Sequence, residues 1–307
     1  MKNKNLVIIE CYCDTEEKLS LLDKMITTLN DKFDILVTTH YFLPERIQAK
    51  IDYLIYDKSN PILKYPERGM EFWRKISNIK ITHIMDDYGW TVYNLKKNAI
   101  SFCADLNYDY YSFINYDIEI TEDLVHLLNN PKDFICTNFL DPISKKSLFP
   151  SLLFNILSKN NANKIYSLID KEDYVKSDPN TNKSLYSDAE AYWGYLISNF
   201  KYKKITTEIV GIANTGNPDV LNYNKVNDDF KLFFDYKNKL LLVYDNHDKK
   251  DIKLNINDSN HIVSNKFELI KLYQVSKLGF YNNGDYINLI PFYNKKHLNR
   301  IEILKEN

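Results

Sequence analysis

Apolar positions follow two different periods along the first two thirds of the chain. Residues 6–9, 33–37 and 51–56 are largely apolar runs of the length of a buried strand. Between the first two runs, an acidic start at residues 14–17 precedes apolar side chains at helical spacing, and residues 44–49 favour a short helix. The apolar positions of the first helix are Leu19, Leu22, Met25, Ile26 and Leu29. This order predicts a β-α-β-α-β arrangement.

A further helix leads into a strand with polar side chains near its end. The helix is predicted from one apolar stripe, formed by Leu95, Ala99, Phe102, Cys103 and Leu106. The strand, residues 111–120, places Asn115, Asp117 and Glu119 at every second position, and side chains alternate along a strand. We therefore expect these three side chains to share one face. Thr121 is the expected N-cap of a helix at residues 124–128.

Two interpretations of these polar positions are open. They could form the wet face of an edge strand, or they could hold a ligand at the carboxyl end of a strand. Strands that alternate with helices usually form a largely parallel sheet covered on both faces, which disfavours a wet face. Such sheets bind ligands at the carboxyl ends of their strands. We expect Asp117 to contact a ligand, with a capping or loop role as its alternative.

The pattern changes near residue 228, where short strand-like runs follow one another without helices between them. The runs are residues 230–234, 239–244, 251–256, 267–272, 286–290 and 300–304. Residues 282–285 have the composition of a hairpin turn. We expect an α/β domain over residues 1–225 and an appended all-β, sandwich-like domain over residues 226–307, with the boundary in the polar stretch at 222–229.

Composition limits the classes of partner. The 307 residues include 40 basic and 41 acidic side chains, so the net charge of −1 attracts neither nucleic acid nor an anionic membrane. No apolar run approaches the roughly 20 residues of a membrane span, so the expected location is cytoplasmic. The spacing of the four cysteines suits neither a zinc site nor a disulfide framework.

The stretch Phe113-Ile-Asn-Tyr-Asp117 resembles the DxD motif of the GT-A glycosyltransferases, enzymes that use nucleotide-diphosphate sugars. The resemblance covers roughly the first 220 residues and implies a Rossmann-like α/β/α sandwich. It also implies Mn²⁺ or Mg²⁺ and a UDP- or GDP-sugar donor as cofactors. Asn115 stands where the family has its first aspartate, and it can accept a hydrogen bond but carries no charge.

The same resemblance assigns roles to individual residues. Asp117 is the expected direct metal ligand, Glu119 a second one, and Asn115 would contact ribose or a metal-bound water. A divalent cation held by carboxylate oxygens would neutralise the charge that develops on the leaving diphosphate. Asp57, at the end of the third predicted strand, resembles the acid that binds the base or ribose; a turn residue is its alternative. His40 follows the second strand and could reach the same crevice.

The candidate general base lies in the acceptor half, where such enzymes place an acid at the start of a helix. Asp188 and Glu190 open a helical segment that carries Tyr192 and Trp193, rings that could stack on sugar. Acids in a first turn are also favoured by the helix dipole alone. The acceptor would be a glycan, a lipid or a protein.

Three functions stay open at this point. The first is a metal-assisted glycosyltransferase. A sugar nucleotidyltransferase would share the sheet, but it usually carries a glycine-rich basic loop after the first strand, where this chain has residues 11–15, CYCDT. The third is a catalytically inactive carbohydrate-binding or assembly protein, which the uncharged Asn115 favours. The all-β domain is a candidate surface for a homo-oligomer.

Overall fold

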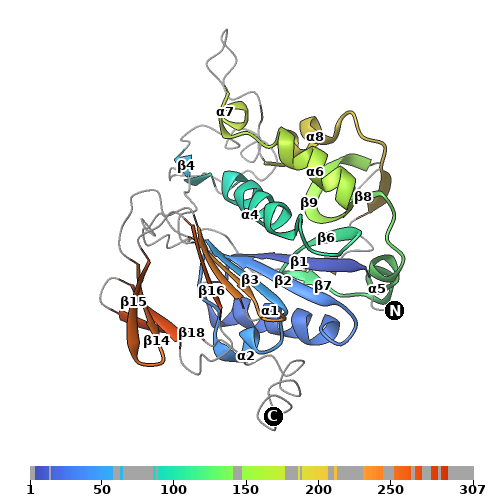
Figure 1. The fold of residues 1–307 in the computed structure, drawn as a ribbon. Helices are drawn as coiled ribbons and strands as arrows, with labels where there is room; N and C mark the ends of the chain where they lie inside the picture. The colour runs from blue at the N-terminus through green and yellow to red at the C-terminus, as the bar shows by residue number, and fades with distance from the viewer. Residues whose placement is uncertain are drawn as a thin grey trace. The chain divides into compact units, whose positions relative to one another are not determined.

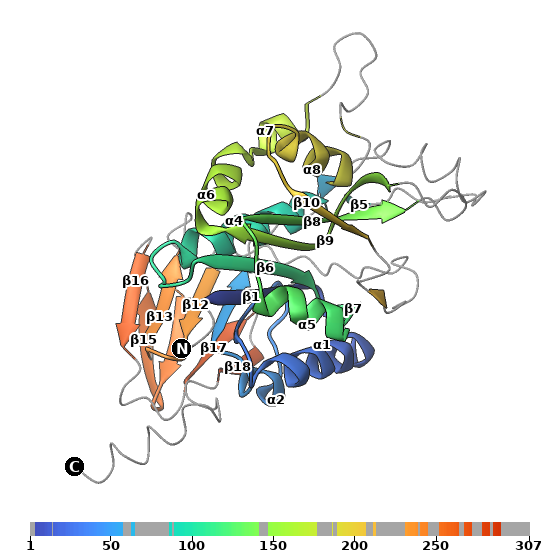
Figure 2. The same ribbon diagram turned by 90° about the vertical axis from the view of Figure 1, so that its right-hand side faces the viewer.

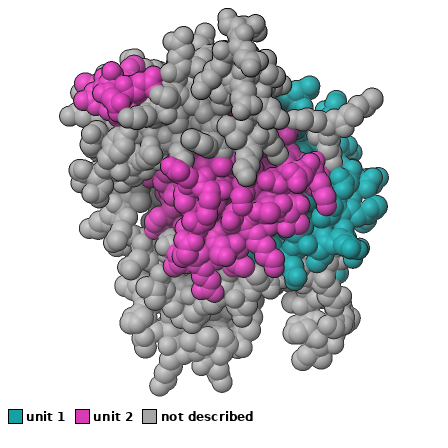
Figure 3. Space-filling view, turned by 90° about the horizontal axis from the view of Figure 1, so that it is seen from below, with its two compact units in different colours: residues 1–10, 60–224 teal, residues 11–59, 225–307 magenta. Residues whose placement is uncertain are grey.

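The structure is a computed structural model, and contacts within the chain divide it into two compact units (Figure 3). Unit 1 contains Met1–Glu10 and Asn60–Asn224, and unit 2 contains Cys11–Ser59 and Lys225–Asn307. Both units contain helices and strands, so the mixed α/β class is confirmed. The residues described are 4–13, 15–57, 63–64, 86–87, 89–140, 147–176, 186, 189–206, 211–212, 231–238, 240–244, 252–263, 267–271, 278–282 and 285–289.

Five strands of unit 1 lie in the order β10-β8-β9-β6-β1. Their bounds are β1 (Asn5–Cys11), β6 (Tyr110–Asn115), β8 (Phe134–Leu140), β9 (Ser147–Ser158) and β10 (Lys203–Thr206). The pairs β1/β6 and β10/β8 are parallel, whereas β9 is antiparallel to both β6 and β8. The predicted strands at the start of the chain and at residue 111 are therefore parallel neighbours.

Helices cover both faces of the β1/β6 pair (Figures 1 and 2). The helices of unit 1 are α4 (Gly89–Cys103), α5 (Glu122–Asn129), α6 (Lys159–Leu168), α7 (Lys171–Tyr174) and α8 (Ala189–Ile197). Glu10 of β1 contacts α4, whereas Asn5 of β1 donates to the backbone oxygen of Leu128 in α5 at 2.8 Å. Because side chains alternate along a strand, these two contacts place α4 and α5 on opposite faces. The predicted N-cap is confirmed, since the Thr121 hydroxyl accepts from the Leu124 N–H.

Unit 2 combines a segment near the start of the chain, Cys11–Ser59, with the last third of the chain. Its strands β2 (Asp34–Thr39) and β3 (Tyr53–Asp57) are parallel, and three antiparallel strands continue from β3 in the order β12-β13-β16. These three are β12 (Lys231–Asp235), β13 (Leu240–Tyr244) and β16 (Phe267–Lys271). Helices α1 (Glu16–Leu29) and α2 (Glu45–Gln48) lie side by side and are joined by an ion pair between Arg46 and Glu16 (Figure 1).

The expected all-β domain over residues 226–307 is not confirmed as a separate body. β12 pairs along its whole length with β3, from Lys231 opposite Asp57 to Asp235 opposite Tyr53. The apolar pattern of a strand shows that it is buried but not which strand it pairs with, and this pairing joins residues 53–57 to residues 231–235. The expected boundary at 222–229 and the expected strand at 300–304 lie outside the described residues.

The remaining described strands form smaller sheets. A four-stranded antiparallel sheet has the order β15-β14-β17-β18, with β14 (Ile252–Ile256), β15 (Ser259–Val263), β17 (Leu278–Asn282) and β18 (Asp285–Leu289). Asn257 and Asp258 join β14 to β15 with φ angles of 51° and 66°, as a two-residue hairpin turn requires. Two-residue strands pair as β4 (Leu63–Lys64) with β5 (Asp86–Asp87), and β7 (Ile118–Glu119) with β11 (Gly211–Ile212). Among the described helices, none combines the length and the hydropathy of a membrane span.

Candidate functional site

Polar side chains gather at the carboxyl ends of β1 and β6 in unit 1. Glu10 of β1 and Asn115 of β6 are paired in register, and both stand at or next to the last residue of their strand. Side chains at paired positions of parallel strands point to the same face. The structure therefore brings Asn115 beside a carboxylate that the sequence analysis did not single out.

The polar alternation predicted along this strand ends at Asn115. Tyr116 and Asp117 form a turn, and the next strand, β7, pairs with β11 rather than extending β6. Asn115, Asp117 and Glu119 therefore do not share one face of a single strand. The turn leaves Asn115 and Asp117 half-buried and Glu119 exposed, so the first two are the more shielded from water.

Glu10 forms an ion pair inside the protein with Lys96 of α4. The Lys96 Nζ lies 3.1 Å from Glu10 Oε2, and the exposed fractions of the two side chains are 0% and 3%. Two aromatic rings surround the ammonium group: the Phe113 ring centre lies 3.8 Å away and the Trp193 ring centre 5.7 Å away. The second oxygen, Glu10 Oε1, is buried and has no hydrogen-bond partner within the described residues.

Burial governs the protonation of this pair. It raises the pKa of the Glu10 carboxyl above its ordinary value, while the nearby Lys96 charge acts in the opposite direction. Burial likewise lowers the pKa of the Lys96 ammonium, while Glu10 opposes the change. Each partner thus favours the charged form of the other in an environment that favours neutral groups.

In unit 2, His40 follows β2 and contacts Asp57 at the end of β3. Asp57 is the last residue of β3 and is fully buried, with one carboxylate oxygen 3.6 Å from the Nζ of Lys231. The His40 Nδ1 lies 3.2 Å from the Asp57 backbone oxygen. Because a carbonyl can only accept, Nδ1 carries the proton and Nε2 is the acceptor nitrogen. Burial lowers the pKa of His40, so the ring is neutral near pH 7.

Of the two candidate bases, Glu190 lies in the first turn of α8, and Asp188 lies outside the described residues. Glu190 is half-buried. Burial raises the pKa of Tyr93, and the charge of Glu190 adds to this effect. The Tyr93 hydroxyl donates to the Ala189 backbone oxygen at 2.6 Å. Tyr192 and Trp193 are fully buried, so neither offers a ring face to a sugar.

Tyr195 of α8 does reach solvent and is 53% exposed. Its ring centre lies 5.3 Å from that of Tyr186. Tyr195 belongs to the helical segment that the sequence analysis selected, but the exposed position is two residues further along than the predicted pair.

Metal binding can be judged from the donor atoms. In the part of the chain that is described, no three His, Cys, Asp or Glu side chains lie close enough to form a metal centre. Mg²⁺ needs fewer protein ligands, because it keeps several waters and commonly takes one or two carboxylates together with substrate phosphates. The oxygens of Asn115 and Asp117 fit that kind of site, and they do not fit a metal held by protein ligands alone.

Comparison with known proteins gives structural matches only. No family model matches the chain, and no curated protein sequence matches it. One similar solved structure is a glycosyltransferase involved in the glycosylation of the major capsid of PBCV-1, with 8% identity and a TM-score of 0.33, covering 66% of this chain and 82% of that one. Two others are structures of the glycosyltransferase GlyE in Streptococcus pneumoniae TIGR4.

The two GlyE structures each show 11% identity, with TM-scores of 0.36 and 0.37. The matches cover 66% and 67% of this chain, and the chain spans 45% and 46% of the length of GlyE. All three of these solved structures are of glycosyltransferases.

Proposed function

We propose that the chain is a glycosyltransferase that transfers a sugar, in the manner of a hexosyltransferase, from a UDP- or GDP-sugar. The observation that supports this best is the set of oxygen-bearing side chains at the carboxyl ends of β1 and β6. Glu10 and Asn115 are in register there, and Asp117 follows in the adjoining turn. In sheets with helices on both faces, this edge is where nucleotides and other ligands bind.

Asp117 is the proposed anionic ligand of Mn²⁺ or Mg²⁺, with Asn115 as a neutral oxygen donor to the metal, to its water or to ribose. The cation would balance the negative charge of the leaving diphosphate. Glu119 is the proposed second ligand. Its exposure makes the contribution of its carboxylate weaker than that of Asp117, because water screens an exposed charge.

His40 and Asp57 are proposed to bind the base or ribose. The Nε2 of neutral His40 and the Asp57 carboxylate are acceptors, which suits a ribose hydroxyl or a base N–H as the donor. The buried pair with Lys231 holds the Asp57 side chain in place at the end of β3.

The general base is proposed to be Glu190 or Asp188, acting on the hydroxyl of a glycan, lipid or protein acceptor. Glu190 lies at the amino end of α8, where the helix dipole stabilises its ionised form. An ionised carboxylate is the form that a base needs in order to accept a proton.

A second candidate is a catalytically inactive carbohydrate-binding protein, which the neutral Asn115 favours. A thermal-shift screen of UDP, GDP and CDP with and without Mn²⁺ separates the two, because a ligand that binds only the native state raises its stability. The glycosyltransferase proposal predicts a Mn²⁺-dependent shift with UDP or GDP, and a larger shift for Asn115→Asp, which adds a second anionic ligand. If no nucleotide shifts the transition with or without Mn²⁺, the proposal fails.

A further inference from the structure

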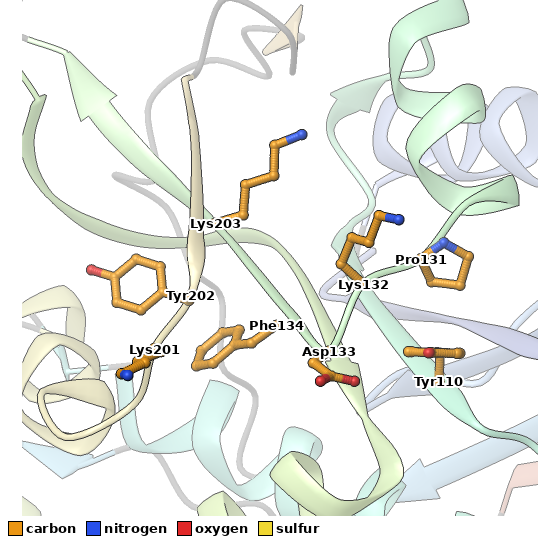
Figure 4. Close-up of a pocket in the computed structure, with 8 residues that line it drawn as sticks. All are labelled: Tyr110, Pro131, Lys132, Asp133, Phe134, Lys201, Tyr202 and Lys203. Atoms are coloured by element: carbon orange, nitrogen blue, oxygen red, sulfur yellow. The ribbon is translucent and has the colours of Figure 1, made fainter.

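A pocket of about 500 Å³ lies in unit 1 at the other end of β6 (Figure 4). Three of the residues that line it begin strands: Tyr110 begins β6, Phe134 begins β8 and Lys203 begins β10. These strands run in one direction, because β9 is antiparallel to both β6 and β8, and β10 is parallel to β8. The pocket therefore lies at the amino-terminal edge. At about 3.3 Å per residue, Tyr110 is roughly 17 Å from Asn115 at the far end of β6.

The pocket has an excess of positive charge. Lys132, Lys201 and Lys203 line it and are exposed, and Asp133 is its one acidic lining residue. Three ammonium groups against one carboxylate leave an excess of two positive charges, in a chain whose net charge is −1. In the view of Figure 4, the ammonium groups of Lys132 and Lys203 lie on one side of the Phe134 ring and that of Lys201 on the other. Ammonium groups on both sides of the ring attract an extended anionic molecule as well as a small inorganic ion.

Aromatic rings form the apolar part of the same pocket. Phe134 is buried and Tyr202 is half-buried, and their ring centres lie 5.2 Å apart with a tilt of 40°. Phe200 packs edge-on against Phe134 at 5.9 Å and supports it. The partly exposed Tyr202 ring can therefore pack against the C–H face of a sugar while the lysines bind an anionic substituent.

We propose that this pocket binds an anionic carbohydrate, a sugar unit that carries a carboxylate, sulfate or phosphate group. The chemistry that recognises it is the combination of the half-buried rings of Tyr110 and Tyr202 with three lysines. Binding here does not require the transfer reaction, because the pocket lies a full strand length from Asn115. A long anionic glycan held in this pocket would be kept at the surface of unit 1.

Two alternative roles explain fewer of these lysines than carbohydrate binding does: protection of the edge of the sheet from pairing with other chains, and nucleic-acid binding. β10 is the last strand in the order of unit 1, and lysines on an edge strand prevent pairing with other chains. That role accounts for Lys203, but Lys132 and Lys201 precede their strands and are not part of an edge. Single-stranded nucleic acid also binds to lysines and rings, but it needs a basic groove that follows several nucleotides. The two tyrosines that line this pocket, Tyr110 and Tyr202, are both half-buried, and a DNA control tests this alternative directly.

Isothermal titration calorimetry on the full chain, without nucleotide or metal, tests the proposal. The probes are a tetrasaccharide of alternating glucuronic acid and N-acetylglucosamine, a sulfated analogue, and glucose 6-phosphate. A neutral tetramer of N-acetylglucosamine and a single-stranded DNA tetranucleotide are the controls. The variants are the double substitution Lys201→Gln with Lys203→Gln, the single substitution Tyr202→Leu, and Lys164→Gln as a matched control at an exposed position of α6.

We expect at least one anionic sugar to bind, and the neutral tetramer and the DNA not to bind. Loss of two charge-assisted contacts should weaken binding by at least about tenfold in the double lysine variant. Tyr202→Leu should weaken it as well, and Lys164→Gln should leave it unchanged. Added salt should weaken the wild type more than the double variant.

Three results would overturn the proposal: no binding of any anionic sugar, equal binding by the double variant, or tighter binding of the DNA. None of these results bears on nucleotide-sugar binding. A failure here is therefore distinguishable from a failure of the proposed transferase.

Discussion

Replacing Lys96 by methionine tests the buried ion pair at the end of β1. Methionine keeps the apolar stem of the lysine and removes its charge, so Glu10 is left in an interior where its side chain is 3% exposed. Removing one partner of a buried pair costs about 3–5 kcal/mol, because the remaining charge is uncompensated. The ring contact with Phe113, at 3.8 Å, adds to this loss. We expect Lys96→Met to lower the free energy of unfolding by about 4 kcal/mol at pH 8.

The loss should depend on pH with a defined sign. Burial raises the pKa of Glu10 in the folded protein above its ordinary value of 4.5, and without Lys96 it rises further. A group with a raised folded pKa contributes stability below its unfolded pKa, and this stability is lost as the pH rises through the folded pKa. The loss caused by Lys96→Met should therefore shrink between pH 8 and pH 5, with a slope of at most about 1.4 kcal/mol per pH unit.

The assay is urea unfolding followed by circular dichroism at pH 5, 6.5 and 8. Lys4→Met is the matched control, because Lys4 pairs with Asp109 at a similar distance of 3.0 Å but both side chains are more than half exposed. That change should cost at most about 1 kcal/mol. Adding Glu10→Gln to Lys96→Met should restore most of the stability. A loss below about 1 kcal/mol at pH 8, or a double variant as unstable as the single one, would refute the reasoning.

Three further predictions concern single contacts. Burial lowers the pKa of His40, so wild type should lose about 1 kcal/mol of stability relative to His40→Gln as the pH falls from 7.5 to 5.5; urea unfolding at both pH values checks this. Thr121→Ala should cost about 1 kcal/mol, because its hydroxyl caps α5 at 3.1 Å from Leu124 N, and Thr121→Ser should cost less; thermal unfolding decides. Asp57→Asn should cost about 3 kcal/mol, because it leaves Lys231 facing a neutral side chain, and the same assay measures it.

The sequence predicted the elements whose signal is local. The strands at residues 6–9, 33–37 and 51–56 and the capped helix after Thr121 all appear, because apolar periodicity and capping act within a few residues. β8 and β9 were not predicted, and in β9 the local signal is misleading because of Pro150. Proline within an apolar run argues against a central strand, and here it lies opposite Asn138, where the β8/β9 pairing shifts register.

Contacts between distant segments could not be predicted in this way. Glu10 and Lys96 are separated by 86 residues, and Lys96 lay beside the apolar stripe of its predicted helix rather than within it. A carboxylate inside an otherwise apolar strand was the available signal, since such a group requires a buried partner. The position of Asp117 was predicted on a strand, but the chain turns at Tyr116, and periodicity along six residues cannot show where a strand ends.

The most direct test of the proposed function is calorimetric titration of UDP and GDP, with and without Mn²⁺, into wild type and Asp117→Asn. Asp117 is the anionic donor of the Asn115-Tyr-Asp117 segment, so its neutralisation should weaken Mn²⁺-dependent nucleotide binding by at least about tenfold. The thermal stability of the variant should be unchanged, because asparagine keeps the size of the side chain and one acceptor oxygen. Equal Mn²⁺-dependent binding by wild type and Asp117→Asn would contradict the assignment of the metal to this turn.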